Sequence, residues 1–222
     1  MTLILHYHPF SSFCQKVLVA LYERGVPFEG VVVDFGDPEK KAAFERLWPM
    51  GKFPVLRDEG RAVTVPESSL IVEYLDRAFA GPPPLVPADP EAALKARLWD
   101  RFFDHYVEVP LQKVVGDSLR PEGARDPHGV GEAKAVLERA YGLLEDRLAP
   151  DEAWVAGEDF TLADCGAAPA LFYAAMVLPF AGRPRLEAYY ARLRARPSFV
   201  RVVDEARPFR SYFPLPWRQG WD

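Results

Sequence analysis

Hydrophobic positions follow two different periods in the first eighty residues of the chain. Short apolar runs that are typical of strands occupy residues 3–6, 31–33, 53–56 and 62–65. Apolar residues spaced as on one face of a helix occupy residues 12–24, 39–47 and 68–79. Gly25 is placed to close the first of these helices, and Asp37-Pro38 to open the second. The predicted order is β-α-β-α-β-β-α, an α/β arrangement.

A proline-rich segment interrupts this pattern between residues 81 and 90. Proline has no amide hydrogen to donate, so this segment is neither helix interior nor central strand. We interpret it as a stiff linker. It separates a domain at residues 1–80 from a second domain at residues 91–222.

Beyond the linker the pattern predicts helices and no strand. A long helix opens at Asp89-Pro90, and Pro110 is expected to end or kink it. Further helices are predicted at residues 130–148, from 161 onward, at 185–196 and at 198–206, followed by an aromatic, proline-rich tail at 209–217. The second domain is therefore expected to be all-helical.

One uncharged segment, residues 165–182, approaches the length of a membrane span. It contains Pro169 and Pro179, is rich in alanine and glycine, and lies between Asp164 and Arg183. These features favour a buried core helix. The first residues of the chain lack a basic region and a small-residue cleavage site, so we expect a soluble cytoplasmic protein without membrane association.

Composition and the absence of certain motifs argue against several kinds of partner and cofactor. The 222 residues are 49% hydrophobic and 27% charged, with a net charge of −5 and no Lys/Arg cluster, so nucleic acid is not expected as a partner. Cys14 and Cys165 cannot build a disulfide framework or a zinc site. No glycine-rich nucleotide motif is present. We therefore expect no metal and no nucleotide cofactor.

Four short motifs in this order resemble the cytosolic glutathione S-transferase family, and the resemblance covers essentially the whole chain. They are residues 11–17 (SSFCQKV), residues 51–56 (GKFPVL), Glu67-Ser68, and residues 161–164 (TLAD). The first fits the family pattern S-x-x-(S/C)-x-(R/K)-V, directly after the first strand. The likeness is to serine-type, bacterial-like members, similar to the zeta, tau and omega-like branches.

The resemblance implies a thioredoxin-like βαβαββα domain followed by a helical bundle. It implies that glutathione is bound as a co-substrate, that its thiolate is stabilised, and that the sulfur is conjugated to a small hydrophobic electrophile. It also implies a two-fold homodimer.

Ser11 is the first candidate for the catalytic group. A hydroxyl at the start of a helix can donate a hydrogen bond to a sulfur anion, and the helix dipole adds positive potential. The alternative for Ser11 is a helix cap alone. Cys14, one helical turn later, is the second candidate, through a mixed disulfide with glutathione, unless it is only a buried apolar residue. Tyr7, where other branches carry a catalytic tyrosine, is the third.

The same resemblance assigns the glutathione contacts. Phe53 would pair its backbone with the cysteinyl part, beside a cis Pro54. Glu67 and Ser68 would hold the γ-glutamyl end, and Lys52 the glycyl carboxylate. Taken without the resemblance, Glu67-Ser68 is only a helix start and Pro54 a trans proline at the start of a strand.

We expect the electrophile pocket between the domains, lined by the long helix after the linker and by the tail. The aromatic candidates are Phe102, His105 and Tyr106, with Phe103 and Phe209 beside them. Most aromatics at helical spacing belong to a core, so only one or two should face the pocket. Asp164 is interpreted as a structural cap.

Three other functions stay open at this point. The same scaffold carries isomerases, dehalogenases and disulfide reductases, and fold does not determine function. A non-catalytic interaction module is the second possibility. A thioredoxin-like domain that binds no glutathione is the third.

Overall fold

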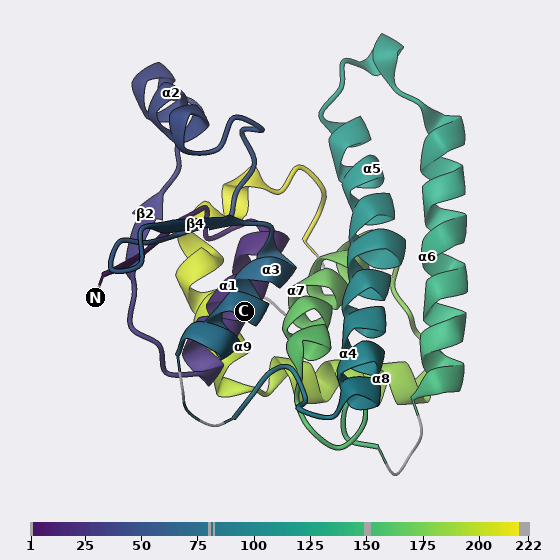
Figure 1. The fold of residues 1–222 in the computed structure, drawn as a ribbon. Helices are drawn as coiled ribbons and strands as arrows, with labels where there is room; N and C mark the ends of the chain where they lie inside the picture. The colour runs from purple at the N-terminus through teal and green to yellow at the C-terminus, as the bar shows by residue number, and fades with distance from the viewer. Residues whose placement is uncertain (1, 80, 82, 149–151, 218–222) are drawn as a thin grey trace.

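The computed structural model describes residues 2–79, 81, 83–148 and 152–217. A four-stranded sheet with three helices forms the N-terminal domain, and a bundle of helices follows it (Figure 1). This confirms the predicted fold class.

The N-terminal domain follows the predicted order of elements. Its strands are β1 (Leu3–Tyr7), β2 (Glu29–Val32), β3 (Val55–Asp58) and β4 (Val63–Pro66), and its helices are α1 (Ser12–Glu23), α2 (Pro38–Leu47) and α3 (Ser68–Ala78). The sheet order is β2-β1-β3-β4, with β1 parallel to β2 and antiparallel to β3. Helices α1 and α3 lie together below the sheet in Figure 1, and α2 lies on the other side. Strand β3 begins later than predicted, after Pro54, which has no amide hydrogen for the ladder.

The second domain consists of helices, as predicted. They are α4 (Pro90–Phe102), the π-helical turn η1 (Phe103–Glu108), α5 (Val109–Ser118), the 3₁₀ turn η2 (Glu122–Ala124), α6 (Pro127–Arg147), α7 (Leu162–Val177), α8 (Pro184–Arg194), α9 (Pro197–Ala206) and the 3₁₀ turn η3 (Arg207–Tyr212). Pro110 does not end the long helix, which instead takes a π-helical geometry just before it. The π-helical turn directly before it accommodates the missing amide hydrogen and the ring, and the chain continues as α5.

Helix α7 forms the centre of the molecule and packs against α1 and α4. Nearly all of its side chains are buried, including Asp164 and Cys165. This confirms the prediction of a core helix for the uncharged segment. Across the described residues, every helix is too short or too polar to cross a bilayer.

A buried carboxylate holds the start of α7. Thr161 and Asp164 form the predicted capping box, in which Asp164 Oδ2 accepts from the Thr161 amide at 2.9 Å. Asp164 Oδ1 also accepts from the Tyr189 hydroxyl at 2.6 Å, a partner that the sequence did not indicate. Burial raises the pKa of Asp164 to about 6, and these hydrogen bonds oppose the rise.

Replacement of Asp164 by alanine should lower the free energy of unfolding by at least about 2 kcal/mol. The helix loses its cap, and the buried Tyr189 hydroxyl loses its acceptor. Urea denaturation of the purified protein measures the loss. The control Asp164→Asn keeps an acceptor oxygen and should lose less. Equal stability of Asp164→Ala and the unmutated protein would contradict a structural role.

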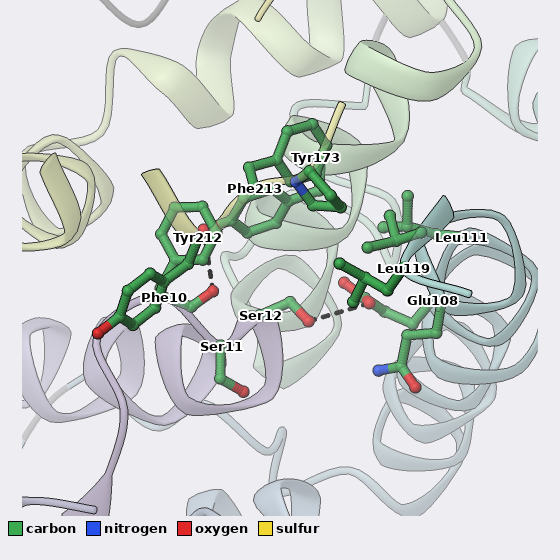
Figure 2. Close-up of a pocket in the computed structure, with 12 residues that line it drawn as sticks. Phe10, Ser11, Ser12, Glu108, Leu111, Leu119, Tyr173, Tyr212 and Phe213 are labelled. Atoms are coloured by element: carbon green, nitrogen blue, oxygen red, sulfur yellow. Dashed lines mark hydrogen bonds between the residues drawn. The ribbon is translucent and has the colours of Figure 1, made fainter. Parts of the chain in front are cut away.

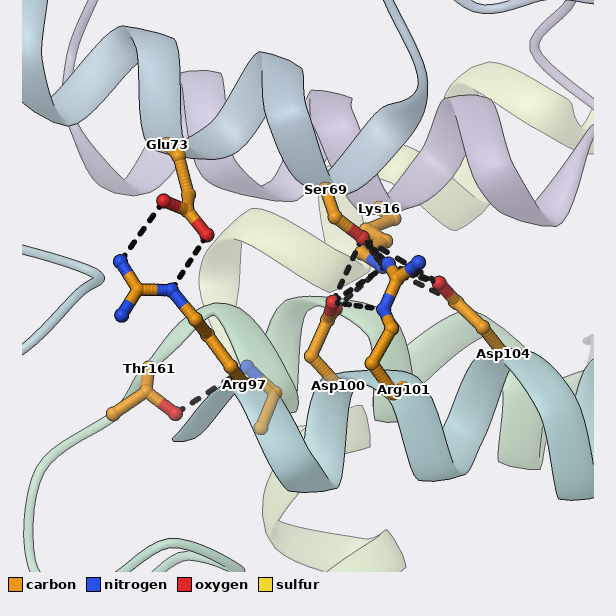
Figure 3. Close-up of polar contacts among 9 residues, drawn as sticks. Lys16, Ser69, Glu73, Arg97, Asp100, Arg101, Asp104 and Thr161 are labelled. Carbon is orange, nitrogen blue, oxygen red and sulfur yellow. Dashed lines mark hydrogen bonds and ion pairs between the residues drawn. The ribbon is translucent and has the colours of Figure 1, made fainter. Parts of the chain in front are cut away.

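A buried polar network joins the two domains (Figure 3). Lys16 Nζ, on α1, lies 2.5 Å from Asp100 Oδ1 and 3.1 Å from Asp104 Oδ1. It also lies 2.7 Å from Ser69 Oγ on α3. Arg101, on the outer side of the network, pairs with both carboxylates. The network therefore fixes α1 and α3 against α4 and η1, which sets the position of the cavities described next.

Candidate active site

The N-terminus of α1 presents Ser11 as its cap. Ser11 has extended backbone angles, and its Oγ accepts from the Cys14 amide at 3.5 Å. The capping role considered from the sequence is therefore present. It does not exclude a second role, because a hydroxyl that accepts a hydrogen bond still has a hydrogen to donate. The first amide groups of α1 add positive potential at the same place.

Five of the six residues expected to bind glutathione line one small cavity of about 170 Å³, whereas the sixth, Ser11, lines a neighbouring cavity described below. The lining of the small cavity is Phe13, Lys52, Phe53, Pro54, Glu67 and Ser68. Strand pairing explains this assembly, because Val55 pairs with Pro66 and so brings the residues just before β3 beside those just after β4. The Phe53-Pro54 bond is cis. Phe13 adds the first turn of α1 to the wall.

Two features of this cavity are typical of a binding site: a strained backbone at Glu67 and a helix N-terminus at Ser68. Glu67 has a φ of +68°, in the left-handed region that non-glycine residues rarely adopt. Such strain costs about 1–3 kcal/mol and is concentrated at functional sites. Ser68 is the first residue of α3, where unpaired amide groups favour an anion. The cavity therefore offers a carboxylate for an ammonium group and a helix N-terminus for a carboxylate.

A second cavity of about 220 Å³ lies between α1, α5, α7 and the C-terminal tail (Figure 2). Ser11 and Ser12 border it on one side, and its other lining residues are Phe10, Glu108, Leu111, Gln112, Val115, Leu119, Tyr173, Tyr212, Phe213 and Pro214. The walls are mainly apolar. An apolar molecule in this cavity would lie beside the N-terminus of α1.

Three aromatic residues expected at the electrophile pocket do not line this cavity. His105 and Tyr106 are exposed on η1, and Phe102 packs against Trp99 and Phe103. The helical register explains the difference, since Glu108, not Tyr106, is the residue of η1 at the cavity. Phe103 is buried in the core.

One helix face that lines the cavity, running from the end of η1 through α5, is absent from the residues expected from the sequence. Glu108, Leu111, Val115 and Leu119 follow one another at intervals of three or four, and Gln112 lies four positions after Glu108, so all five share one helix face. That spacing was a usable signal. The aromatic residues just before this face are the more obvious candidates for an apolar pocket.

The tail contributes to the site, as expected. Tyr212 borders both the apolar cavity and a third cavity of about 490 Å³, which Phe209 also lines. The His8 ring lies 4.8 Å from the Phe209 ring and 5.5 Å from the Tyr212 ring. Phe53 borders this third cavity and the cavity at Ser68. Shared lining residues therefore connect the three cavities in a row.

Cys14 is fully buried on α1. Burial raises the pKa of its thiol to about 12, although hydrogen bonds involving His8 and Ser11 oppose the rise. A thiol in this state is a poor nucleophile at neutral pH. The environment matches the small apolar residue that was one of the two interpretations of Cys14.

Tyr7 faces the second strand. Its ring lies so close to Gly30 that a Cβ atom added there would approach Tyr7 Cε1 to 2.9 Å. The residue is half-buried, and desolvation raises its pKa. Tyr7 does not line the cavities at Ser11 or at Ser68. Its position is that of a packed residue of the sheet.

No group of three or more His, Cys, Asp or Glu side chains that could hold a metal ion occurs within the described ranges. Both cysteines are free and buried.

Comparison with known proteins agrees with this geometry. The family model for the glutathione S-transferase N-terminal domain matches residues 5–83, and the model for the C-terminal domain matches residues 117–192. A relative from Zea mays, glutathione S-transferase 3, is 32% identical over 208 residues, which cover 90% of this chain and 92% of the maize protein.

Two further similarities show the range of these relatives. The crystal structure of a glutathione S-transferase from Methylobacillus flagellatus with glutathione bound has a TM-score of 0.80 and 29% identity, covering 90% of this chain and 98% of that one. The FtsZ-localized protein A of Caulobacter vibrioides is 28% identical over 213 residues, which cover 92% of each chain. Both halves of the chain, in their expected order, are matched, and the chain belongs to the glutathione S-transferase family.

Proposed function

We propose that this protein binds glutathione, stabilises its thiolate and conjugates the sulfur to a small hydrophobic electrophile. The observation that carries the proposal is the meeting of Lys52, Phe53, Pro54, Glu67 and Ser68 at one cavity beside the first turn of α1. The maize relative is named a glutathione S-transferase, and the Methylobacillus structure contains glutathione, which supports the same reading. A cytoplasmic location stays a prediction.

Each group at the site has a proposed role. Glu67 binds the ammonium of the γ-glutamyl end, while the Ser68 hydroxyl and the α3 amide groups bind its carboxylate. The Phe53 backbone pairs with the cysteinyl part, which the cis Pro54 keeps accessible. Lys52 binds the glycyl carboxylate.

Ser11 is the proposed catalytic group. Its hydroxyl donates a hydrogen bond to the glutathione sulfur, and together with the α1 amide groups it favours the thiolate over the thiol. The thiol proton passes to solvent, and the sulfur attacks an electrophile in the apolar cavity beside Ser11 and Ser12. The buried Cys14 thiol, with its raised pKa, disfavours disulfide exchange as the main activity.

Steady-state conjugation of glutathione with 1-chloro-2,4-dinitrobenzene tests the proposal. We expect turnover that saturates with both substrates. Binding of glutathione without turnover of any electrophile would favour an interaction module instead. Absence of binding would exclude the glutathione site.

We also propose that two copies of the chain associate through α3 and α4. Large apolar side chains stand exposed on this face: Leu70 on α3, Leu94 and Leu98 on α4, and Tyr106 on η1. Arg97 on α4 pairs with Glu73 on α3, which joins the two helices that carry Leu70, Leu94 and Leu98 (Figure 3). A contiguous exposed apolar surface is typical of an interface, and two-fold pairing lets it cover itself.

Substitution of Leu98 by glutamate should halve the molar mass in solution. The unmutated protein should have twice the 25.0 kDa mass of one chain by light scattering. Two glutamates at the centre of a two-fold apolar interface would be buried without partners. Leu143→Glu, at a leucine on α6 that is 50% exposed against 62% for Leu98, should leave the mass unchanged. A monomeric unmutated protein would contradict the proposal.

A further inference from the structure

A tight turn carries the chain from β1 into α1 and places Ser11 at the start of the helix. The Ser11 amide donates to the His8 carbonyl at 3.0 Å, which closes a four-residue turn with Pro9 and Phe10 at its centre. Pro9 is buried, and a buried carbonyl oxygen needs a donor. The carbonyl oxygens of Pro9 and Phe10 each find one in a side chain outside the turn.

These two donors come from different domains. Gln15, on α1, donates from Nε2 to the Pro9 oxygen at 2.9 Å. Tyr173, on α7, donates its hydroxyl hydrogen to the Phe10 oxygen at 3.2 Å (Figure 2). Gln15 Nε2 also donates to the Tyr173 oxygen at 2.9 Å, so the two side chains and the two turn carbonyls form one network. Both side chains are buried.

Packing alone does not account for a glutamine at this position. Gln15 is fully buried, yet its Oε1 has no hydrogen-bond partner among the described residues. A buried acceptor without a partner lowers stability, so packing alone would favour an apolar side chain of the same length. A polar group kept at such a cost is expected where it serves the function. Burial raises the pKa of Tyr173, so its hydroxyl keeps its hydrogen at neutral pH and both donors remain available to the turn.

We propose that Gln15 and Tyr173 are positioning residues that hold this turn so that the Ser11 hydroxyl points at the glutathione sulfur. The Phe10 oxygen belongs to the planar peptide that ends in the Ser11 nitrogen, so a rotation of this peptide displaces the Ser11 side chain. The cap bond from the Cys14 amide to Ser11 Oγ is long, at 3.5 Å, and constrains the hydroxyl little. Because Tyr173 lies on α7, the helical domain then takes part in activating glutathione. The inference rests on the transferase function proposed above and names the residues that position its catalytic group.

The test measures the ultraviolet absorbance of the glutathione thiolate at saturating glutathione, without an electrophile, in Tyr173→Phe. This substitution keeps the ring on the wall of the apolar cavity and removes only the hydroxyl that binds the Phe10 oxygen. We expect the absorbance to fall together with kcat for 1-chloro-2,4-dinitrobenzene, by about tenfold, a part of the 10²-fold that a displacement of about 1 Å can cost.

A second buried tyrosine provides the matched control. Tyr141, on α6, donates its hydroxyl to the Leu178 oxygen at 3.1 Å and lines none of the three cavities. Tyr141→Phe therefore removes a similar bond from the same domain. It should leave both the absorbance and kcat unchanged.

Gln15→Met tests the same network from its other side. Methionine has a similar length and no hydrogen to donate, so the absorbance and kcat should fall here too. Because the two residues hold one turn, the losses should not add. The double variant Gln15→Met with Tyr173→Phe should lose little more than the more severe single variant. KM for glutathione should rise less than kcat falls, because the ends of glutathione are bound at the cavity beside Glu67 and Ser68.

Each result decides a different point. Equal thiolate absorbance in Tyr173→Phe and the unmutated protein would overturn the positioning role. A similar loss in Tyr141→Phe and Tyr173→Phe would also overturn it, because a general loosening of the helical domain would then be the cause. Fully additive losses in the double variant would overturn the shared network. A protein that gives no thiolate signal without any substitution would overturn the transferase function and this inference with it.

Discussion

Ser11→Ala should lower kcat for conjugation of an aryl chloride by about 10²–10³-fold, the usual loss when one donor to a reacting anion is removed. Its hydroxyl is proposed to donate the hydrogen bond that stabilises the glutathione thiolate. Fewer glutathione molecules would then be ionised at neutral pH. Steady-state kinetics at saturating glutathione measures the loss.

Two further variants separate this role from helix capping. Ser11→Thr keeps a hydroxyl and a cap, so it should keep most of the activity. Ser11→Asp keeps a cap for α1 but has no hydrogen to donate and repels the thiolate, so it should be stable and inactive. Full activity in Ser11→Asp would show that Ser11 is only a cap.

Lys16→Met should lower the free energy of unfolding by about 3 kcal/mol, the lower end of the range for breaking a buried ion pair. Lys16 lies in contact with the carboxylates of Asp100 and Asp104, all three groups being buried. Removal of the lysine leaves two neighbouring negative charges, which only the half-exposed Arg101 still compensates. Urea denaturation measures the change.

A pair on the surface of the same two helices provides the control. Arg97 and Glu73 also join α4 to α3, at 2.8 Å, but both side chains are substantially exposed. Arg97→Met should therefore cost at most about 1 kcal/mol. The double variant Lys16→Met with Asp100→Asn should recover part of the loss, since it removes one unpaired charge. A loss below about 1 kcal/mol in Lys16→Met would mean that the network does not hold the domains together.

Much of the fold could be predicted because its signals are local. The apolar spacing of α1, the Asp37-Pro38 start of α2 and the Thr161–Asp164 capping box each involve neighbouring residues. The π-helical turn before Pro110 could not, because a proline in a helix indicates a disturbance but not which geometry relieves it. The contact of Tyr189 with Asp164 joins residues 25 positions apart, and no local pattern indicates it.

The candidate site also contains residues that local motifs predict and residues that only the packing of the domains brings together. Phe53, Pro54, Glu67 and Ser68 stand in short motifs, and strand pairing brings the motifs together. The apolar cavity is formed by α1, α5, α7 and the tail, so its lining depends on how the domains pack. Glu108 shows the limit: a glutamate usually faces solvent, but the packing of η1 against α7 and its neighbours buries this one, with Ser12 of α1 as its hydrogen-bond donor.

The ultraviolet absorbance of the glutathione thiolate tests the central claim most directly. Glutathione is titrated at neutral pH into the unmutated protein, Ser11→Ala and Ser11→Thr. We expect a saturable thiolate signal in the unmutated protein, its loss in Ser11→Ala and its retention in Ser11→Thr. A signal that survives in Ser11→Ala would transfer the role to Cys14 or Tyr7, and no signal in the unmutated protein would contradict glutathione activation altogether.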